Sequence, residues 1–315
     1  MKTIRLRFVN FPATYNPKTS LFYEVISRHF VIDMVSDPDY VIFGHGGAEH
    51  VHYDQKVKIL FLAENSLPDF NAFDYAMGMG HANLGDRYLR LPLYAVWKNG
   101  LRRWAERQSV VTRELTGRKF CSFVVSNAQF GDPMRKKFFE RLSKYKRVDS
   151  GGRWMNNVGG PVDDKIGFCS GYKFNIAFEN SSSPGYVTEK IMEAYVARTV
   201  PIYYGDPTVE TDFRLESMVR LRGESDIERA VDEVVALDRD DDAYLKKVTE
   251  PCLAYEDPKM YEKRLEAFLL RIFEQPLDMA RRRCFYGHQQ MMREHMRKLM
   301  AIDGWIGKAR RILHV

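Results

Sequence analysis

Short runs of hydrophobic residues alternate with stretches of amphipathic helical spacing along most of the 315-residue chain. Apolar runs bounded by polar segments predict buried strands, and their alternation with helices is typical of parallel sheets covered by helices. In the first third, the pattern predicts strands at Ile4–Val9, Tyr40–Phe43, Val57–Leu62 and Phe73–Met77, and helices at Ser20–Phe30 and Leu91–Arg107.

Residues 108–118 are polar and show no strong periodicity, so we predict a domain junction there. After this junction the alternation of strand and helix patterns begins again. The predicted strands are Phe120–Val125, Lys173–Phe178, Val200–Tyr204 and a segment near Met218–Leu221, and the predicted helices are Pro133–Tyr145, Val187–Ala197, 226–237 and 259–274.

A chain of this length usually exceeds what one hydrophobic core serves. We therefore predict an α/β fold of two Rossmann-like domains that face a cleft. The N-terminal domain spans residues 1–115, the C-terminal domain spans 116–275, and 276–315 form a basic helical tail. The tail is predicted either to return to the first domain as a helix or to be a frayed appendage.

The net charge of +6 is concentrated in the tail. Residues 281–315 hold nine Lys or Arg and two acidic residues, whereas the rest of the chain holds 39 basic and 40 acidic residues. The high isoelectric point therefore belongs to the tail, and the charge gives little reason to expect nucleic-acid binding.

The cellular compartment is inferred from the hydrophobic pattern and from the cysteines. No apolar run reaches the roughly 20 residues of a membrane helix, and the first residues read as a strand, not as a secretory signal. The four cysteines lie far apart without a CxxC pair, which favours free thiols in a reducing compartment. We therefore expect a cytoplasmic protein.

The densest group of chemically active residues follows the predicted strand Lys173–Phe178. Glu179 and Asn180 open a loop of small residues, and a helix begins near Val187 with Lys190 in its first turn. Ligands of open α/β sheets bind beyond the carboxyl ends of strands, and a helix start attracts phosphate. A cation there opposes the helix dipole unless an anionic ligand is present. The simpler alternative is a salt-bridged helix start.

A second junction of the same kind follows the strand Phe120–Val125. A polar loop that contains Asn127 leads to Pro133, which suits the first position of a helix, and to Arg135. Arg135 alone reads as a surface residue. Two such junctions in one domain, each with a basic residue at the helix start, indicate a clamp for a diphosphate.

These motifs resemble a known family. The segments Phe178–Ser181 and Gly185–Lys190 are similar to the signature of the α1,3-fucosyltransferases of glycosyltransferase family 10, especially its Helicobacter-type bacterial members. Further matches lie at Val148–Gly152, Asn156-Asn157, Val200–Gly205, Glu64-Asn65, Pro68–Ala76 and Asp86–Pro92. The similarity extends from about Leu60 to Pro207.

The resemblance implies a GT-B fold in which the C-terminal domain binds the donor, GDP-β-L-fucose, and the N-terminal domain binds most of the acceptor. It implies donor-binding roles, with Arg135 and Lys190 on the diphosphate and Glu189 on the ribose, for a set of six residues: Asn127, Arg135, Asn180, Tyr186, Glu189 and Lys190.

The same resemblance implies that Glu64 is the general base. Fucose would be transferred with inversion to the 3-hydroxyl of N-acetylglucosamine in a β-galactosyl-N-acetylglucosamine (Lewis x type) acceptor. Such a reaction needs a base on the acceptor hydroxyl and a stabilised leaving group opposite it. Without the resemblance, Glu64 reads as an exposed carboxylate at the end of a strand.

We expect no cofactor and no required divalent metal, because the basic residues can stabilise the leaving GDP. The acidic run Asp238–Asp242 contains a DxD pattern, but it falls between two predicted helices, where acids cap a helix start. His45, in a glycine-rich loop after a strand, is a candidate acceptor contact or a turn residue.

The sequence leaves three alternatives to consider. The chain could use another nucleotide sugar or acceptor on the same fold, or be a catalytically silent glycan-binding relative. A Rossmann-type oxidoreductase is disfavoured, because the first strand-to-helix turn lacks the GxGxxG fingerprint. Peripheral contact of the basic tail with the inner face of the membrane stays open.

Overall fold

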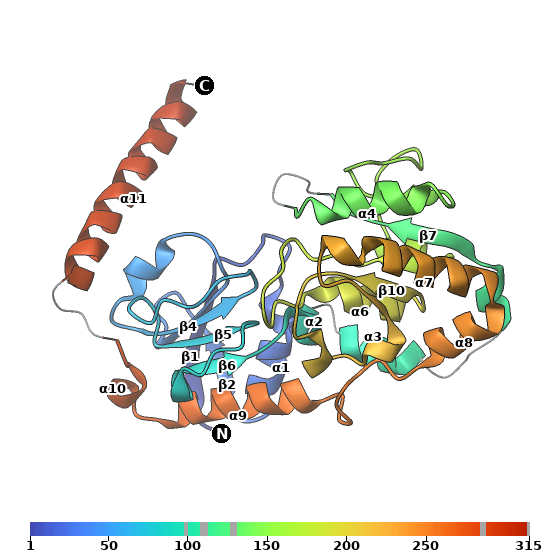
Figure 1. Ribbon diagram of the computed structural model, residues 1–315. Helices are drawn as coiled ribbons and strands as arrows, with labels where there is room; N and C mark the ends of the chain where they lie inside the picture. Colours follow the sequence, from blue (N-terminus) through green and yellow to red (C-terminus); the bar gives the residue numbers. More distant parts are fainter. Residues whose placement is uncertain (98–99, 108–112, 127–130, 284–287, 314–315) are drawn as a thin grey trace. The chain divides into compact units, whose positions relative to one another are not determined.

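The computed structural model describes residues 1–97, 100–107, 113–126, 131–283 and 288–313. The chain forms two compact units (Figure 1). Unit 1 consists of Met1–Gly78, Ala82–Leu91 and Glu262–Val315, and unit 2 consists of Met79–His81 and Pro92–Tyr261. Each unit contains a parallel sheet with helices, which confirms the predicted α/β class with two domains.

The sheet of unit 1 has six strands in the order β2-β1-β3-β4-β5-β6. They are β1 (Thr3–Val9), β2 (Val31–Met34), β3 (Tyr40–Phe43), β4 (Val57–Leu62), β5 (Tyr75–Gly78) and β6 (Tyr88–Arg90). Every residue of β3 and β4 is buried, and their runs, apolar except for the buried Lys58 of β4, predicted both strands. The edge strands β2 and β6 were not predicted, because they are short and mostly exposed or half-buried.

Helix α1 (Leu21–Ser27) lies between β1 and β2 in the chain. The Ser20 side chain accepts a hydrogen bond from the backbone N–H of Tyr23, which caps the helix start. The buried face of the helix carries Phe22 and Ile26. Its amphipathic spacing predicted this element correctly.

The C-terminal segment of the chain also belongs to unit 1. It contains α9 (Met260–Glu274), α10 (Leu277–Ala280) and α11 (His288–Leu313). The Phe273 ring lies edge-on to Tyr40, with ring centres 4.8 Å apart. Arg293 and Arg297, at the start of α11, lie 3.3 and 2.6 Å from a carboxylate oxygen of buried Asp54. The tail is thus a helix whose beginning docks on unit 1.

The sheet of unit 2 has five parallel strands in the order β11-β10-β9-β7-β8. They are β7 (Lys119–Phe123), β8 (Val148–Ser150), β9 (Tyr172–Ile176), β10 (Val200–Tyr203) and β11 (Val219–Arg220). The helices are α2 (Leu93–Val96), α3 (Gly100–Arg107), α4 (Met134–Ser143), α5 (Lys165–Cys169), α6 (Glu189–Val196), α7 (Ile227–Arg239) and α8 (Asp241–Thr249). The core includes Phe138, Phe174 and Tyr244, all fully buried. Strand β8 and the helices α5 and α8 were not predicted.

The single helix predicted over Leu91–Arg107 is wrong. Its first part ends at Val96, because Trp97 has an extended backbone (ψ 122°), and α3 begins at Gly100. Both helices pack within unit 2. The Tyr94 ring lies 4.8 Å from Phe213, and a Cβ at residue 100 would lie 3.0 Å from Met192.

The predicted domain boundaries therefore differ from those of the two units. The chain passes into unit 2 at Pro92, not at residue 116, and returns to unit 1 at Glu262 instead of remaining with the C-terminal domain. Hydrophobic periodicity identifies a helix but not the sheet that the helix covers.

Candidate active site

The loops at the carboxyl ends of β7, β9 and β10 are joined to one another in unit 2. The backbone N–H of Glu179 donates to the carbonyl of Tyr204, and that of Asp132 donates to Asn180. The Tyr204 hydroxyl donates to Asp132 at 2.9 Å, and the Ser182 hydroxyl donates to the carbonyl of Gly205 at 2.6 Å. The structure thus brings together the two predicted strand-loop-helix junctions.

Glu179 lies at the centre of this region, fully buried beyond the end of β9. One carboxylate oxygen accepts the backbone N–H of Thr188 at 2.7 Å, and the other accepts the Thr188 hydroxyl at 2.6 Å and the Lys190 ammonium at 3.0 Å. A buried carboxylate needs such partners to repay its desolvation. Sequence reasoning gave no role to Glu179 or Thr188, although a carboxylate directly after an apolar strand was the available signal.

Lys190 is held in the first turn of α6. Its ammonium donates to Glu179 and to the Thr188 hydroxyl, and it lies 3.7 Å from a carboxylate oxygen of Glu189. Burial alone would lower the pKa of Lys190, but the charges of Glu179 and Glu189 outweigh it and raise the pKa. The ammonium therefore stays charged, as a contact to an anion requires.

Arg135, in the first turn of α4, is also buried. Its Nη2 donates to the carbonyl of Phe178 at 2.8 Å and to the side-chain oxygen of Asn180 at 2.7 Å. Its Nε is buried without a hydrogen-bond partner among the described residues. The alternative interpretation as a surface residue is wrong, because Arg135 is 2% exposed and supports the loop that follows β9.

Glu189 opens α6 and lies between two cations. Burial alone would raise its pKa, but Lys190 and Lys165 outweigh that effect and lower it. Lys165 itself forms an ion pair of 2.7 Å with Glu193, one turn further along the helix. The Glu189 carboxylate is therefore ionised at neutral pH and can accept hydrogen bonds from hydroxyl groups.

The loop before α6 adopts a backbone that only glycine tolerates well. Gly185 has φ +83°, and a Cβ there would lie 2.6 Å from the carbonyl oxygen of Met79 and 2.9 Å from the backbone nitrogen of His81. Its N–H donates to the carboxylate of Asp206 at 2.9 Å. Tyr186, which follows, is buried. The Met79–His81 segment and Asp206 are members of this region that sequence reasoning missed.

Two other residues were predicted for the site, Glu64 and Asn127. Glu64 lies in unit 1, two residues beyond the end of β4, with a side chain that is 54% exposed. Its Oε1 lies 3.5 Å from Nε2 of His45. Asn127 lies outside the described residues.

The acidic run between α7 and α8 serves the local structure. Asp240 caps α8, because its side chain accepts the backbone N–H groups of Asp242 and Ala243 at 3.0 and 2.9 Å. Asp241 pairs with Lys173 at 3.1 Å. These contacts agree with the capping interpretation of the DxD pattern. In the part of the chain that the structure describes, no three His, Cys, Asp or Glu side chains gather closely enough to hold a metal ion.

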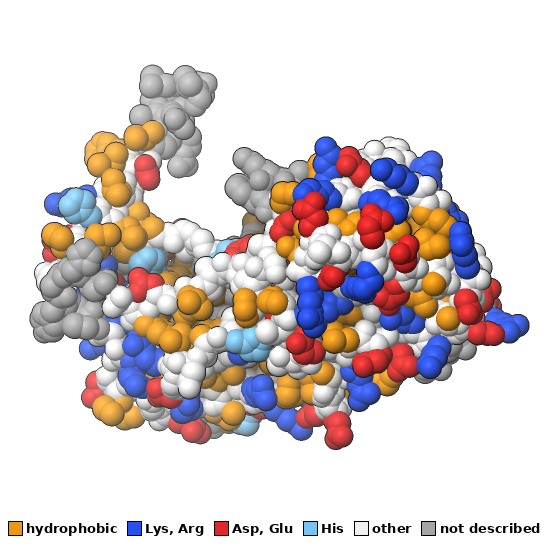
Figure 2. Space-filling model, viewed as in Figure 1, with side chains coloured by type: hydrophobic (Ala, Val, Ile, Leu, Met, Phe, Trp, Pro, Cys, Tyr) orange, Lys and Arg blue, Asp and Glu red, His pale blue; other side chains and the backbone are white. Residues whose placement is uncertain are grey.

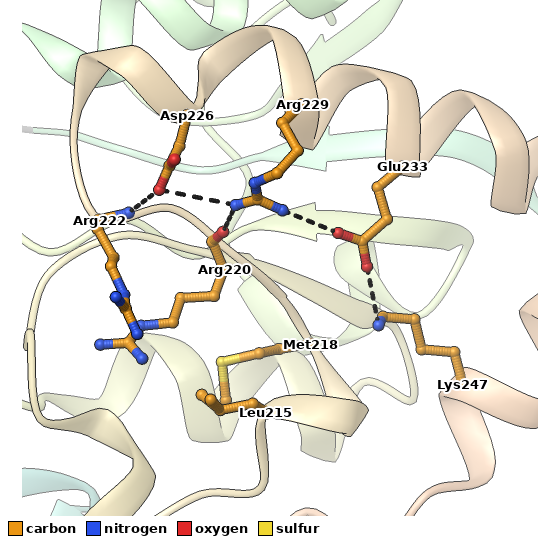
Figure 3. Close-up of a pocket in the computed structure, with 8 residues that line it drawn as sticks. All are labelled: Leu215, Met218, Arg220, Arg222, Asp226, Arg229, Glu233 and Lys247. Carbon is orange, nitrogen blue, oxygen red and sulfur yellow. Dashed lines mark hydrogen bonds and ion pairs between the residues drawn. The ribbon is translucent and has the colours of Figure 1, made fainter.

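A separate hollow of about 380 Å³ lies beside the edge strand β11 (Figure 3). Its cations are largely matched by acids: Arg229 lies between Asp226 and Glu233, and Glu233 also contacts Lys247 at 2.9 Å. None of the predicted site residues lines this hollow.

Two family models match the chain. The model of the α-(1,3)-fucosyltransferase FucT N-terminal domain matches residues 6–97, and the model of the C-terminal part of glycosyltransferase family 10 (fucosyltransferase) matches residues 116–249.

Individual relatives point in the same direction. The chain is 33% identical over 300 residues to an α-(1,3)-fucosyltransferase of Helicobacter pylori, a match that covers 82% of this chain and 62% of that protein. It is 32% identical over 90 residues to α-(1,3)-fucosyltransferase B of Drosophila melanogaster, covering 24% of this chain and 20% of that protein. The chain thus spans less than two thirds of the length of these curated relatives.

Solved structures are similar over more of the chain. A crystal structure of an α1,3-fucosyltransferase matches with a TM-score of 0.75 and 28% identity, covering 87% of this chain and 91% of that one. A structure of an α1,3-fucosyltransferase with GDP-fucose matches with a TM-score of 0.70 and 28% identity, covering 87% of this chain and 92% of that one.

Proposed function

Because the chain belongs to glycosyltransferase family 10, the fucosyltransferases, we propose that it transfers L-fucose from GDP-fucose to a glycan acceptor. The observation that carries this proposal is the pair of buried cations, Arg135 and Lys190, at two neighbouring helix starts in unit 2. A diphosphate is the ligand chemistry that such a pair recognises. A similar protein has been solved with GDP-fucose, which supports this donor.

The proposed reaction inverts the anomeric carbon in one step. The acceptor hydroxyl oxygen attacks C1 of the fucose as the bond from C1 to the diphosphate oxygen breaks, and GDP leaves with that electron pair. Glu64 takes the proton of the hydroxyl, so that a β-linked donor yields an α-fucoside. The exposure of its carboxylate supports this role, since a base must reach the acceptor.

Charge that develops on the leaving GDP is met by Lys190, by Arg135 and by the start of α6, whose N–H groups the Thr188 side chain does not cap. Three groups of the protein are thus available to stabilise the diphosphate. We therefore propose that transfer needs no divalent metal. In this arrangement Glu189, Tyr186 and Asn180 would contact the ribose and the remainder of the donor.

The proposed acceptor is the 3-hydroxyl of N-acetylglucosamine in a β-galactosyl-N-acetylglucosamine unit, which would yield a Lewis x type product. The proposal rests on the sequence motifs around Glu64 and on the α1,3 linkage of the similar enzymes. Acceptor binding would fall mainly to unit 1.

The tail has the composition of a helix that lies on a membrane surface. Large apolar side chains recur at helical spacing on α11 and are exposed: Met291, Met292, Leu299, Ile302, Trp305 and Ile306. Figure 2 shows hydrophobic side chains on the surface of this helix. Basic residues such as Lys298 lie among them. Of the helices that the described residues form, none is both long enough and apolar enough to cross a membrane. We propose peripheral contact with anionic lipid through this helix.

The proposed function is tested by incubating the protein with GDP-fucose and N-acetyllactosamine, with the product linkage assigned by NMR and a parallel reaction in chelator. We expect an α1,3-fucosylated product in both reactions. No transfer to any β-galactosyl acceptor, with intact GDP binding, would leave a glycan-binding relative as the better description. Transfer that chelator abolishes and metal restores would overturn the metal-free mechanism.

A further inference from the structure

Thr188 contributes a hydroxyl that is used twice within the described structure. It donates to Oε2 of Glu179 at 2.6 Å and accepts the ammonium of Lys190 at 2.8 Å. The residue is 2% exposed, although it lies directly before α6. As the residue that precedes the helix, Thr188 would ordinarily turn its hydroxyl back to cap the helix N–H groups, but its side chain makes no such bond. The hydroxyl is directed to the ion pair instead.

An ammonium has three N–H donors. In Lys190, one donates to Glu179 at 3.0 Å and one to Thr188 at 2.8 Å, so one remains for a ligand. The side chain is 17% exposed, so part of it is accessible to a ligand. Two fixed partners restrict a long and flexible side chain to one orientation, which lowers the entropic cost of binding.

We propose that Thr188 is a positioning residue that orients the Lys190 ammonium toward the diphosphate of the donor. This inference rests on the proposed function, and it concerns how the donor is held. Glu179 supplies the negative charge that keeps Lys190 near the loop, and the hydroxyl of Thr188 determines in which direction the remaining N–H points.

Thr188 allows a cleaner test than Glu179. Replacing Glu179 removes a negative charge close to the bound phosphate, which would strengthen GDP binding, and at the same time releases Lys190, which would weaken it. Thr188→Val has nearly the same shape and no change in charge, so only the hydroxyl is lost. Thr188→Ser keeps the hydroxyl and removes a methyl group.

A second threonine at the other end of α6 provides the matched control. Thr199 is 1% exposed, and its hydroxyl donates to the carbonyl of Ala194 at 3.0 Å. Thr199→Val therefore also deletes one buried hydroxyl, but far along the helix from Lys190. It measures what a buried threonine costs in stability without a change at the donor site.

The experiment measures GDP affinity by calorimetry and melting temperature for the unaltered chain and each variant. We expect Thr188→Val to bind GDP about tenfold more weakly, as for the loss of one hydrogen bond to a charged group. Thr188→Ser should recover most of the affinity, and Thr199→Val should bind as the unaltered chain does. If Thr188→Val does not fold, Thr188→Ala compared with Thr188→Ser isolates the same oxygen atom.

A double-mutant cycle with Lys190→Met decides whether Thr188 acts through the lysine. We expect Thr188→Val to cause no further loss of GDP affinity once Lys190 is replaced. An equal loss in both backgrounds, or full affinity in Thr188→Val, would overturn the inference while leaving the proposed function intact. Full affinity in Lys190→Met would overturn both the inference and the donor role of Lys190. Failure of the unaltered chain to transfer fucose would count against the proposed function alone.

Discussion

Two carboxylates with opposite surroundings distinguish the two units. Glu179 of unit 2 is fully buried and accepts three hydrogen bonds from Thr188 and Lys190. Glu64 of unit 1 has a side chain that is 54% exposed, with His45 at 3.5 Å. A carboxylate whose oxygens accept hydrogen bonds from other residues of the protein holds those residues in place. An exposed carboxylate is available to take a proton.

This difference suits two separate proposed tasks, donor binding in unit 2 and proton transfer by Glu64 in unit 1. The proposed donor region is organised by buried charges before any ligand is present, so its geometry is a property of unit 2. The side chain of the proposed base is 54% exposed, so the surroundings of its carboxylate within unit 1 do not enclose it. Variants of each unit can therefore separate effects on donor binding, on stability and on the rate of transfer.

The largest expected effect is on chemistry, from Glu64→Gln. The amide cannot take the acceptor proton, so we expect the rate of fucose transfer to fall by about 10²–10⁴-fold. GDP affinity should be unchanged, because the residues proposed to bind the diphosphate belong to unit 2. Transfer kinetics and calorimetry on the same preparation check both parts. Normal turnover would remove Glu64 from the mechanism.

The next effect is on stability, from the buried ion pair of unit 1. Arg283 and Asp74 have fully buried side chains 3.1 Å apart, and burial raises the pKa of Asp74 to about 7 and lowers that of Arg283 to about 9. Arg283→Met should lower the free energy of unfolding by about 3–5 kcal/mol, because the buried Asp74 carboxyl loses its charged partner and keeps only the backbone N–H groups of Lys58 and residues 282 and 283. The carbonyls of Asp54 and Lys56 also lose the guanidinium that donates to them.

Urea unfolding measures this loss, and Arg282→Met is its control, since Arg282 forms a more exposed pair with Asp86. GDP affinity of the folded fraction should stay the same in both variants. A weakened GDP affinity in Arg283→Met would show that the ion pair of unit 1 also supports the donor region.

A smaller effect is expected from Lys190→Met. Loss of one contact to the leaving diphosphate should cost about 2–4 kcal/mol in the transition state, with weaker GDP binding. The control is Lys136→Met, which changes an exposed lysine on the neighbouring helix α4. Comparison of kcat and KM for GDP-fucose measures the loss. Equal kinetics for the two variants would contradict the diphosphate assignment.

The smallest effect concerns pH. The lowered pKa of Glu189 means that its ionised form stabilises the folded state above the ordinary glutamate pKa, and that this contribution is lost as the pH falls through the lowered value. Glu189→Gln should therefore lose less stability than the unaltered chain between about pH 5 and about pH 3.

Urea unfolding at each pH provides the measurement, and Glu140→Gln, which removes an exposed carboxylate, is the control. Parallel pH profiles for the unaltered chain and Glu189→Gln would show that the Lys190 and Lys165 charges do not stabilise this carboxylate.

Much of the fold followed from local patterns. The central strands β3 and β4 were predicted because both of their faces are buried, which produces runs that are apolar except for the buried Lys58 of β4. The same patterns placed Glu179 and Lys190 around one loop, since loops after buried strands are where ligands of open sheets bind. The cap formed by Asp240 was also readable, because a cap is a local contact.

Other features depended on contacts between distant parts of the chain. The amphipathic pattern of helix α9 does not identify the sheet that it covers, and contacts such as those of Phe273 with Tyr40 and Phe30 assign it to unit 1. Helix α2 ends before Trp97, although the helix itself contains no proline or glycine that would predict this end. Thr188 and Arg135 likewise form hydrogen bonds with residues of the loop after β9, such as Glu179 and Asn180.

The sequence by itself therefore determined the α/β class, the central strands and the two strand-loop-helix junctions that carry Arg135 and Lys190. Hydrophobic periodicity and helix caps involve residues close in sequence, so they can be recognised without the tertiary structure. The tertiary structure decided which unit each helix joins and which charges pair inside it. The reason is physical: the burial and the partner of a charge depend on chain segments that are distant in sequence and adjacent only after folding.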